Sequence, residues 1–485
     1  MANRVHGLYH PTKSSSLFIN IHAAIGVISM NDKQSLAQDL IAGKIGRRDF
    51  IMRALALGVS LSGIEAILQS CGTSNSSSSN TTTLKFANWA SAESATRDNI
   101  NKALQDFQNQ NNAKITNIGI PFDQVLQQLT TMTNGGNPPD VMELSGNWPY
   151  ALGGAGALEP LDSYISPSWK SDSFPNSFEV GSYKGKVYAA PFSITPHGFW
   201  YSKDLMTSAG LDPAKPPKTT DELNQMMATL RAKLPADAYP IGIDISKTEY
   251  ALVGFWPWIW TFGGNPMVDD GKGNVTINWA DSGTVAAFQW LQDAVNKKWT
   301  PPDQAIKAER ELMANGKIAF KLDGPYLTGI FANTNPALNT VDAVNSKFGV
   351  TTTPMGPGLS SPVTAADIHN LGMSAQAQNK QLAWKLIDFL TTSDSVITKF
   401  LIPEGGVLPH KSYNVTGGKY AKNYADTISQ SFINNVIPTM RPPAYGPRYS
   451  TAASFVVSAL QEIAGGANVK QRLTQLTNEV KTVYA

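Results

Sequence analysis

Strand and helix patterns alternate between Leu84 and Leu144, and this order restricts the chain to a small set of folds. Leu84–Trp89 alternates like a strand, Ile115–Pro121 reads as a second strand, and Pro138–Leu144 reads as a loop entering a third. Two stretches with helical spacing lie between them, marked by Ile100, Ala103, Leu104 and Phe107 and by Phe122, Val125, Leu126 and Leu129. Strands joined by helices pair in parallel, so the sequence predicts an α/β fold.

New elements continue the alternation toward the C-terminus. Thr219 and Glu222 have the spacing of a capping box at the start of a helix, and Gly316–Leu322 is a strand that enters the turn Asp323–Tyr326. Further helices are predicted around Val285–Val295, Leu382–Leu390, Ser454–Ile463 and Val469–Val483. About 400 residues exceed what one hydrophobic core supports, so two α/β lobes are expected. Ligands then favour the crevice beyond the carboxyl ends of the strands.

Cys71, the only cysteine of the 485 residues, stands at the end of an export-signal pattern. Arg47 and Arg48 precede the apolar stretch Ala54–Leu68, which is shorter than the roughly 20 residues of a membrane-spanning helix. A run of small polar residues follows from Gly72 to Thr83. This order predicts a Tat-like lipoprotein signal region over residues 1–70, and an acylated Cys71 with a Ser/Thr/Asn tether over residues 71–83.

Other interpretations of the N-terminus stay open. Ordinary secretion is the alternative to Tat export, and an intracellular chain with Cys71 as a stray thiol is the alternative to both. Residues 1–29 fit neither a leader nor a fold, and Met30 begins a more usual leader. The true start is therefore expected at Met30.

Charge and composition narrow the function classes. Residues 1–70 hold 7 of the 39 Lys and Arg residues and 4 of the 37 Asp and Glu residues, which leaves the mature chain a net charge of −1. Without a basic block, no nucleic-acid partner is expected. Acylation of Cys71 leaves no thiol for disulfides, catalysis or metal ligation. No cofactor and no metal are expected, and the membrane is contacted through the lipid only.

Four groups of short motifs follow one another across residues 84–485. The first group is Pro139–Met142 with Gly156–Leu161, and the second is Gly185–Phe192 with Tyr201–Leu205, Ala209–Pro213 and Pro216–Leu223. The third group is Gly316–Phe320 with Gly324–Tyr326, and the fourth is Ala383–Leu390 with Gly406–Pro409. In order and spacing this set resembles the extracellular solute-binding proteins of ABC importers, family 1, the maltose-binding-like carbohydrate group. The lipoprotein leader agrees with this resemblance independently.

The resemblance implies a two-lobe clamp of the periplasmic-binding-protein kind with three hinge crossings. These would fall near Pro191–His197, Thr351–Pro357 and Thr391–Thr398. Lobe 1 would comprise residues 84–192 and 358–392, and lobe 2 would comprise residues 193–350 and 398–485. The protein would be a monomer, lipid-anchored on the extracellular or periplasmic face of the cell membrane. It would capture a mono-, di- or oligosaccharide between the lobes and deliver it to the transmembrane subunits of an ABC permease.

The resemblance also places candidate ligand contacts in loops after strands and at the hinge. They are Trp89, Ser145, Asn147, Trp148, His197, Trp256, Asp323, Tyr326, His369, Asn370, Arg441 and Tyr445. Sugars need aromatic planes and bidentate polar groups. The leading pair is Asp323, which could accept two hydroxyl hydrogen bonds, and Tyr326, which would stack. Structural roles stay open for Trp89 in the core, His197 at the hinge and Asp323 as a turn cap.

Two candidates carry further expectations. In the run Phe255–Trp260, Trp256 and Trp260 share a helix face while Trp258 points away, and Trp256 is the expected contact. The segment His369–Leu371 replaces a Gly-rich stretch common in relatives.

An enzyme is the main functional alternative. A secreted glycoside hydrolase needs two carboxylates about 5–10 Å apart, and the sequence offers Glu143 and Asp323 without any motif that marks them. Zinc-binding His-Glu-x-x-His, Gly-x-Ser-x-Gly and phosphate-loop motifs do not occur in the sequence. The sequence therefore predicts a binding protein rather than an enzyme. A binder of another polar solute, such as a polyol or a glycerophosphodiester, stays open.

Overall fold

The computed structural model describes residues 82–94, 96–269, 274–302 and 305–485. The signal region, Cys71 and residues 72–81 of the tether lie outside the described residues. The first strand, β1 (Thr82–Asn88), begins two residues before the strand predicted from the sequence. The end of the expected tether is therefore part of a sheet.

In the described part of the chain, five strands form a first sheet in the order β2-β1-β3-β14-β6. Their bounds are β2 Ala113–Gly119, β3 Val141–Leu144, β6 Ala189–Ile194 and β14 Ile368–Met373. The pairing of β1 with β2 and with β3 is parallel, as the alternation predicted. In contrast, β14 comes from much later in the chain and runs antiparallel between β3 and β6. The ends of β1 and β3 and the start of β14 thus share one edge.

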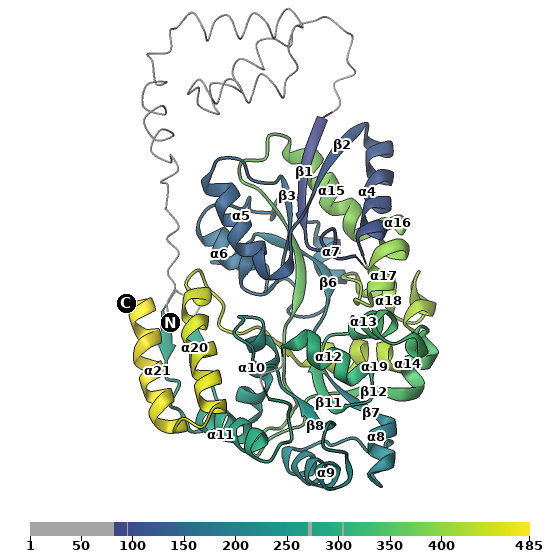
Figure 1. Cartoon of the computed structure of the whole chain (residues 1–485). Coiled ribbons are helices and arrows are strands. Elements are labelled where there is room, and N and C mark those ends of the chain that lie inside the picture. The colour runs from purple at the N-terminus through teal and green to yellow at the C-terminus, as the bar shows by residue number, and fades with distance from the viewer. Residues whose placement is uncertain (1–81, 95, 270–273, 303–304) are drawn as a thin grey trace, which may run out of the picture. The chain divides into compact units, whose positions relative to one another are not determined.

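Helices cover both faces of the first sheet (Figure 1). On one face, α4 (Arg97–Asn111) and α15 (Lys380–Thr392) meet through Phe107 and Phe389, whose ring centroids are 5.3 Å apart. The apolar residues predicted for α4 are all buried. On the other face, α5 (Val125–Asn134) and α6 (Trp148–Gly154) cover a second apolar cluster. Phe122 lies in the short 3₁₀ turn before α5, so the predicted helix begins later than expected.

A second sheet of the described residues has four strands in the order β12-β7-β11-β8. Their bounds are β7 Gly198–Ser202, β8 Tyr239–Gly242, β11 Ile318–Asp323 and β12 Phe348–Thr351. Its helices are α8 Lys203–Ser208, α9 Thr220–Lys233, α10 Ala251–Thr261, α11 Ser282–Asn296, α12 Ile306–Ala314, α13 Leu327–Thr334, α14 Val341–Lys347, α20 Tyr449–Ala464 and α21 Val469–Tyr484. The capping box of α9 is confirmed, because Thr219 and Glu222 exchange the two expected side-chain hydrogen bonds.

Short elements fill the remaining connections of the described chain. They are the strands β4 Ser182–Tyr183, β5 Lys186–Val187, β9 Met267–Asp269, β10 Val275–Ile277, β13 Thr364–Ala365 and β15 Met440–Arg441, and the helices α7 Pro167–Asp172, α16 Asp394–Val396, η3 Ile397–Leu401, α17 Ile402–Glu404, α18 Lys411–Asn414, α19 Thr427–Ser431 and η5 Phe432–Val436. No helix among the described residues is long and apolar enough to cross a membrane.

The chain passes between the two sheets more than once. It leaves β6 for β7 through Thr195–His197 and returns from β12 to β14 through residues 352–367. After α15, the turns α16 and η3 still pack against α4, whereas α19 packs against β12 of the second sheet. The last passage therefore lies between α16 and α19. The two-lobe α/β fold is confirmed, and the lobe limits 84–192, 358–392, 193–350 and 398–485 remain predictions.

Candidate ligand-binding site

A buried ion pair lies where β11 ends. The guanidinium of Arg310 donates from Nε to Oδ2 of Asp323 over 2.8 Å and from Nη2 to Oδ1 over 2.7 Å, and the N–H of Gly324 donates to Oδ1 over 2.9 Å. Burial alone would raise the pKa of Asp323, but the guanidinium overcomes this effect and holds the pKa below its usual value. Because three of roughly four acceptor sites are in use, Asp323 cannot accept two ligand hydroxyls as predicted.

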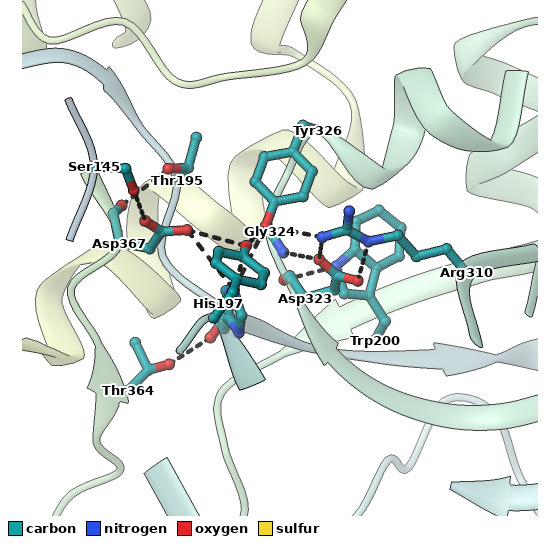
Figure 2. A network of polar contacts seen from close by, with 11 residues as sticks. Ser145, Thr195, His197, Trp200, Arg310, Asp323, Gly324, Tyr326, Thr364 and Asp367 are labelled. Atoms are coloured by element: carbon teal, nitrogen blue, oxygen red, sulfur yellow. Dashed lines mark hydrogen bonds and ion pairs between the residues drawn. The ribbon is translucent and has the colours of Figure 1, made fainter. Parts of the chain in front are cut away.

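The hydroxyl of Tyr326 connects this ion pair to the hinge. It lies 2.6 Å from the hydroxyl of Tyr250 and accepts from Nη2 of Arg310 over 3.2 Å, while the guanidinium lies 5.0 Å from the ring centroid. His197, fully buried between β6 and β7, places Nε2 3.3 Å from the Tyr250 hydroxyl. Burial lowers the pKa of His197 to about 4, so its imidazole is neutral near neutral pH. Figure 2 shows these groups converging on one point.

Asp367 is the third part of the network. Its carboxylate accepts from the Ser145 hydroxyl over 3.2 Å and from the Tyr250 hydroxyl over 3.3 Å (Figure 2). Burial raises the pKa of Asp367 to about 7. Ser145 follows β3 of the first sheet and Tyr250 precedes α10 beside the second, so this network joins the two halves of the fold.

Six rings form what we call the aromatic cluster: Trp89, Phe122, Trp148, Tyr250, Tyr326 and His369. The Trp89 ring meets those of Phe122 and His369 edge to face, with centroids 5.3 and 4.8 Å apart. Phe122 reaches Tyr250 over 5.4 Å, and Tyr326 stacks with His369 over 6.4 Å. The cluster thus extends from the ends of strands of the first sheet to the turn after β11 of the second.

The carboxylate of Glu143 lies beside this cluster. Glu143 is 1% exposed, and Nδ1 of His369 is 3.7 Å from its Oε1. Among the described residues, neither carboxylate oxygen has a hydrogen-bond partner, and the same holds for Nδ1 of His369, Oδ1 of Asn370 and Oε2 of Glu404. Leaving one buried polar group unpaired costs about 1–3 kcal/mol. Groups on a ligand that donate or accept hydrogen bonds at these atoms would remove that cost.

Burial keeps these groups from ionising. It raises the pKa of Glu143 well above its usual value, aided by the charges of Glu404 and Glu93. Burial, together with Glu93, raises the pKa of Glu404 to about 8. Burial lowers the pKa of His369 to about 3. A β-bulge between His369 and Asn370 shifts the register of β14 here, and bulges commonly re-aim side chains beside functional sites.

The remaining predicted residues lie away from this point. The Trp256 indole N–H donates to the Tyr449 hydroxyl over 2.7 Å, and its ring stacks on Trp260 over 5.6 Å, so it belongs to the core around α10. Trp258 instead stacks on Trp290, which confirms that it points away from Trp256. We therefore no longer place Trp256 at the ligand.

Three more of the predicted residues, Arg441, Asn147 and Tyr445, contact neighbouring loops and helices. Arg441 is exposed, donates to Oδ1 of Asn265 over 2.7 Å and covers the Trp260 ring. Asn147 accepts from the Gly446 N–H and donates to the Ser450 hydroxyl, both over 3.1 Å. Tyr445 packs on Tyr150 and Tyr449, with ring centroids 5.6 and 4.9 Å away. Asn147 and Tyr445 thus connect the loop after β3 to the loop before α20.

Several residues of the site were not predicted. They are Phe122, Tyr250, Arg310, Asp367 and Glu404, together with Glu143, which was considered only for a hydrolase. A charged residue inside an apolar stretch was the available signal, as for Glu143 in Val141–Leu144 and Asp367 after Ala365 and Ala366. Arg310 carried no such signal, because it is one of several charged residues in α12.

Comparison with known proteins agrees with this geometry. The sequence profile of bacterial extracellular solute-binding proteins matches residues 89–397. The diacetylchitobiose binding protein DasA of Streptomyces coelicolor is 28% identical over 343 residues, covering 69% of this chain and 76% of that protein.

Two solved structures share the fold. A solute-binding protein of Thermotoga lettingae bound to α-D-tagatose has a TM-score of 0.72 and 21% identity, over 84% of this chain and 100% of its own. Maltose-bound MalE3 of T. maritima has a TM-score of 0.68 and 22% identity, over 83% of this chain and 99% of its own. Proteins of this kind act outside the cytoplasm and bind solutes rather than transform them. By sequence and by fold, the chain belongs to the bacterial extracellular solute-binding proteins.

Proposed function

We propose that the protein is the lipid-anchored, extracellular substrate-binding component of an ABC importer, and that its solute is a carbohydrate. The observation that carries this proposal is the aromatic cluster beside the unpaired Glu143 carboxylate, between the two sheets. Aromatic planes suit the C–H faces of a sugar, and unpaired buried polar atoms suit its hydroxyls. The relatives support the same class, since one is named for diacetylchitobiose and another, from Pyrococcus abyssi, for maltotriose.

A clamp of two lobes explains how the bound solute would be delivered to the permease. A ligand held between them favours the closed state by its greater affinity for that state, and the closed form then docks on the permease. The proposed contacts are Trp89, Trp148, Tyr326, His369 and Asn370, and we add Glu143 because its buried oxygens have no hydrogen-bond partner among the described residues. Ser145, His197 and Asp323 would hold these contacts in place through the Tyr250 and Arg310 network. The protein is proposed to act as a monomer without a cofactor.

A thermal-shift screen tests the function. The full-length chain is melted with mono-, di- and oligosaccharides, polyols, glycerophosphodiesters, polyamines and peptides. A ligand at 100 times its dissociation constant adds about 2.7 kcal/mol to stability, which shifts the melting temperature by a few degrees. A response to one saccharide class, with the saccharide recovered intact, supports the proposal. A response to polyols or phosphodiesters alone would refute the carbohydrate assignment, and hydrolysis of the sugar would indicate an enzyme.

A further inference from the structure

Two further carboxyl groups, those of Glu404 and Glu93, influence Glu143. Glu404 and Glu93 both act electrostatically on Glu143, and Nδ1 of His369 lies 3.7 Å from its Oε1. Glu93 also acts electrostatically on Glu404 and contributes to its raised pKa. Glu93 lies on the exposed loop after β1, Glu404 is half-buried in α17, and Glu143 is buried in β3. Carboxyl groups from three separate elements therefore influence one another electrostatically.

The basic groups near this site do not form an ion pair with Glu143. Arg310 pairs with Asp323 through two N–H groups and covers the Tyr326 ring, and its charge acts on Glu93 and Asp367 but is not among the charges acting on Glu143. Lys307 is exposed and acts on Glu93 rather than on Glu143. His369 is neutral, because burial holds its pKa far below neutral pH. Within the described residues, no cation balances the Glu143 carboxylate.

Aromatic rings complete the surroundings. Trp89, His369 and Tyr326 follow one another at centroid distances of 4.8 and 6.4 Å, and the middle ring, His369, lies beside Glu143. Rings and a carboxylate around one position are the combination that recognises an ammonium group, since the ring faces attract cations and the carboxylate pairs with the charge. An ammonium also supplies three hydrogen-bond donors, which suits the two unpaired oxygens of Glu143.

We propose that the captured saccharide is an amino sugar, whose protonated amine lies against Glu143 and the ring faces of the aromatic cluster. This inference rests on the proposed carbohydrate-binding function and specifies its substrate class. A neutral sugar could accept hydrogen bonds only from a protonated Glu143, or donate weaker ones to an ionised Glu143. An ammonium forms a charge-assisted pair with the ionised carboxylate, and such hydrogen bonds are roughly twice as strong as neutral ones.

Calorimetric titration with three probes tests the proposal. The full-length protein is titrated near neutral pH with chitobiose, which has two free amines, with diacetylchitobiose, in which both amines are acetylated, and with spermidine. We expect chitobiose to bind about tenfold more tightly than diacetylchitobiose, with spermidine weaker than either. Equal or tighter binding of diacetylchitobiose would overturn the amino-sugar assignment. Tightest binding of spermidine would also overturn it, since the amine would then come from an aliphatic ligand.

The two proposals fail in different ways. If neutral saccharides bind and chitobiose gains nothing, the carbohydrate receptor stands and the amino-sugar inference falls. If no saccharide of any class binds in the wider screen, the proposed function falls and the inference falls with it.

A charge-removing variant tests the role of Glu143 itself. In Glu143→Gln, we expect chitobiose to lose about tenfold in affinity and diacetylchitobiose to change less than about threefold. The matched control is Glu311→Gln, on an exposed position of α12, which should alter neither titration. A merely structural role of Glu143 would weaken both ligands equally, and that outcome would refute the proposal. Unchanged melting temperature and far-UV circular dichroism verify that the variant folds.

Titration in two buffers provides an independent check. Because burial keeps Glu143 and Glu404 protonated, pairing with an ammonium requires loss of protons from the site. The apparent enthalpy of chitobiose binding should therefore depend on the ionisation enthalpy of the buffer, and less so in Glu143→Gln. The titration is made at a pH low enough to keep the free sugar amine protonated, so that the amine cannot itself take up the Glu143 proton; an enthalpy independent of the buffer in the unmodified protein would then contradict the ion pair.

Discussion

Arg310 and Asp323 face each other through two parallel hydrogen bonds, of 2.8 and 2.7 Å, with the carboxylate fully buried. This pair places the turn that carries Tyr326, because Gly324 also donates to the Asp323 carboxylate. Asp323, which was expected to contact the ligand, instead holds the turn that carries Tyr326. Its role is to position Tyr326 rather than to bind.

Removal of Arg310 should therefore destabilise the protein strongly. In Arg310→Ala the buried Asp323 carboxylate loses its counter-charge, and we expect the free energy of unfolding to fall by about 3–5 kcal/mol. Urea unfolding followed by tryptophan fluorescence measures this change. The control is Lys317→Ala, which removes the partner of the exposed Asp237 and should leave stability within error. A loss in Arg310→Ala no greater than in this control would contradict the buried ion pair.

Stability should fall as the pH is raised from about 6.5 to about 8.5. Burial raises the pKa of Asp367 to about 7 and that of Glu404 to about 8, so both take up protons on folding. The stability that they contribute is lost as the pH rises through these folded-state values. Burial lowers the pKa of His197 to about 4, so the stability contributed by its neutral imidazole increases as the pH rises to about 6.5. Below about pH 6.5 this contribution acts against the decline caused by Asp367 and Glu404.

Thermal melts across this range check the prediction. The variant Asp367→Asn should show a flatter decline, because it removes one of the titrating groups. In Asp106→Asn the slope should be unchanged, since hydrogen bonds from Lys399 and Ser395 hold the pKa of the half-buried Asp106 below its usual value. A decline as steep in Asp367→Asn as in the unmodified chain would show that Asp367 is ionised throughout.

Loss of the Tyr326 ring should weaken the ligand. Tyr326 is 8% exposed, stacks with His369 and bonds to the Tyr250 hydroxyl. For Tyr326→Ala we expect at least about a tenfold loss of saccharide affinity and a stability loss of about 3 kcal/mol, with unchanged far-UV circular dichroism. Tyr326→Phe keeps the ring and should retain most of the affinity. Full affinity in a folded Tyr326→Ala variant would remove this residue from the site.

Trp256 should be dispensable for binding. Its indole N–H bonds to the Tyr449 hydroxyl and its ring packs between Trp260 and Trp279 in the core. In Trp256→Phe we expect stability to fall by about 1–3 kcal/mol and saccharide affinity to change less than twofold. Denaturant unfolding and calorimetry measure the two effects separately. A marked loss of affinity at unchanged stability would return Trp256 to the site.

Cys71 should be needed for membrane attachment but not for saccharide binding. It lies outside the described residues, and we expect Cys71→Ala to release the protein from membranes while saccharide affinity stays the same. Fractionation with a carbonate wash, followed by calorimetry on the soluble fraction, measures both properties. If the variant still sediments with washed membranes, the lipid is not the anchor.

Local patterns predicted much of the fold, and contacts between distant segments account for what they missed. The helical spacing of Ile100, Ala103, Leu104 and Phe107 records a single buried face, and that face is confirmed. Arg310 meets Asp323, and Glu143 meets His369, only because separate elements fold together. A sequence taken alone shows that such charges exist, but not which of them become neighbours. The fold was therefore easier to predict than the chemistry of the site.

The place of β14 between β3 and the edge strand β6 has a consequence for folding during synthesis. β14 joins β3 to β6, so β6 has no partner in the first sheet until residue 373 has left the ribosome. An unpaired strand edge promotes aggregation, and pairing between distant segments is slow. The nascent chain therefore leaves β6 exposed in this sheet until late in synthesis.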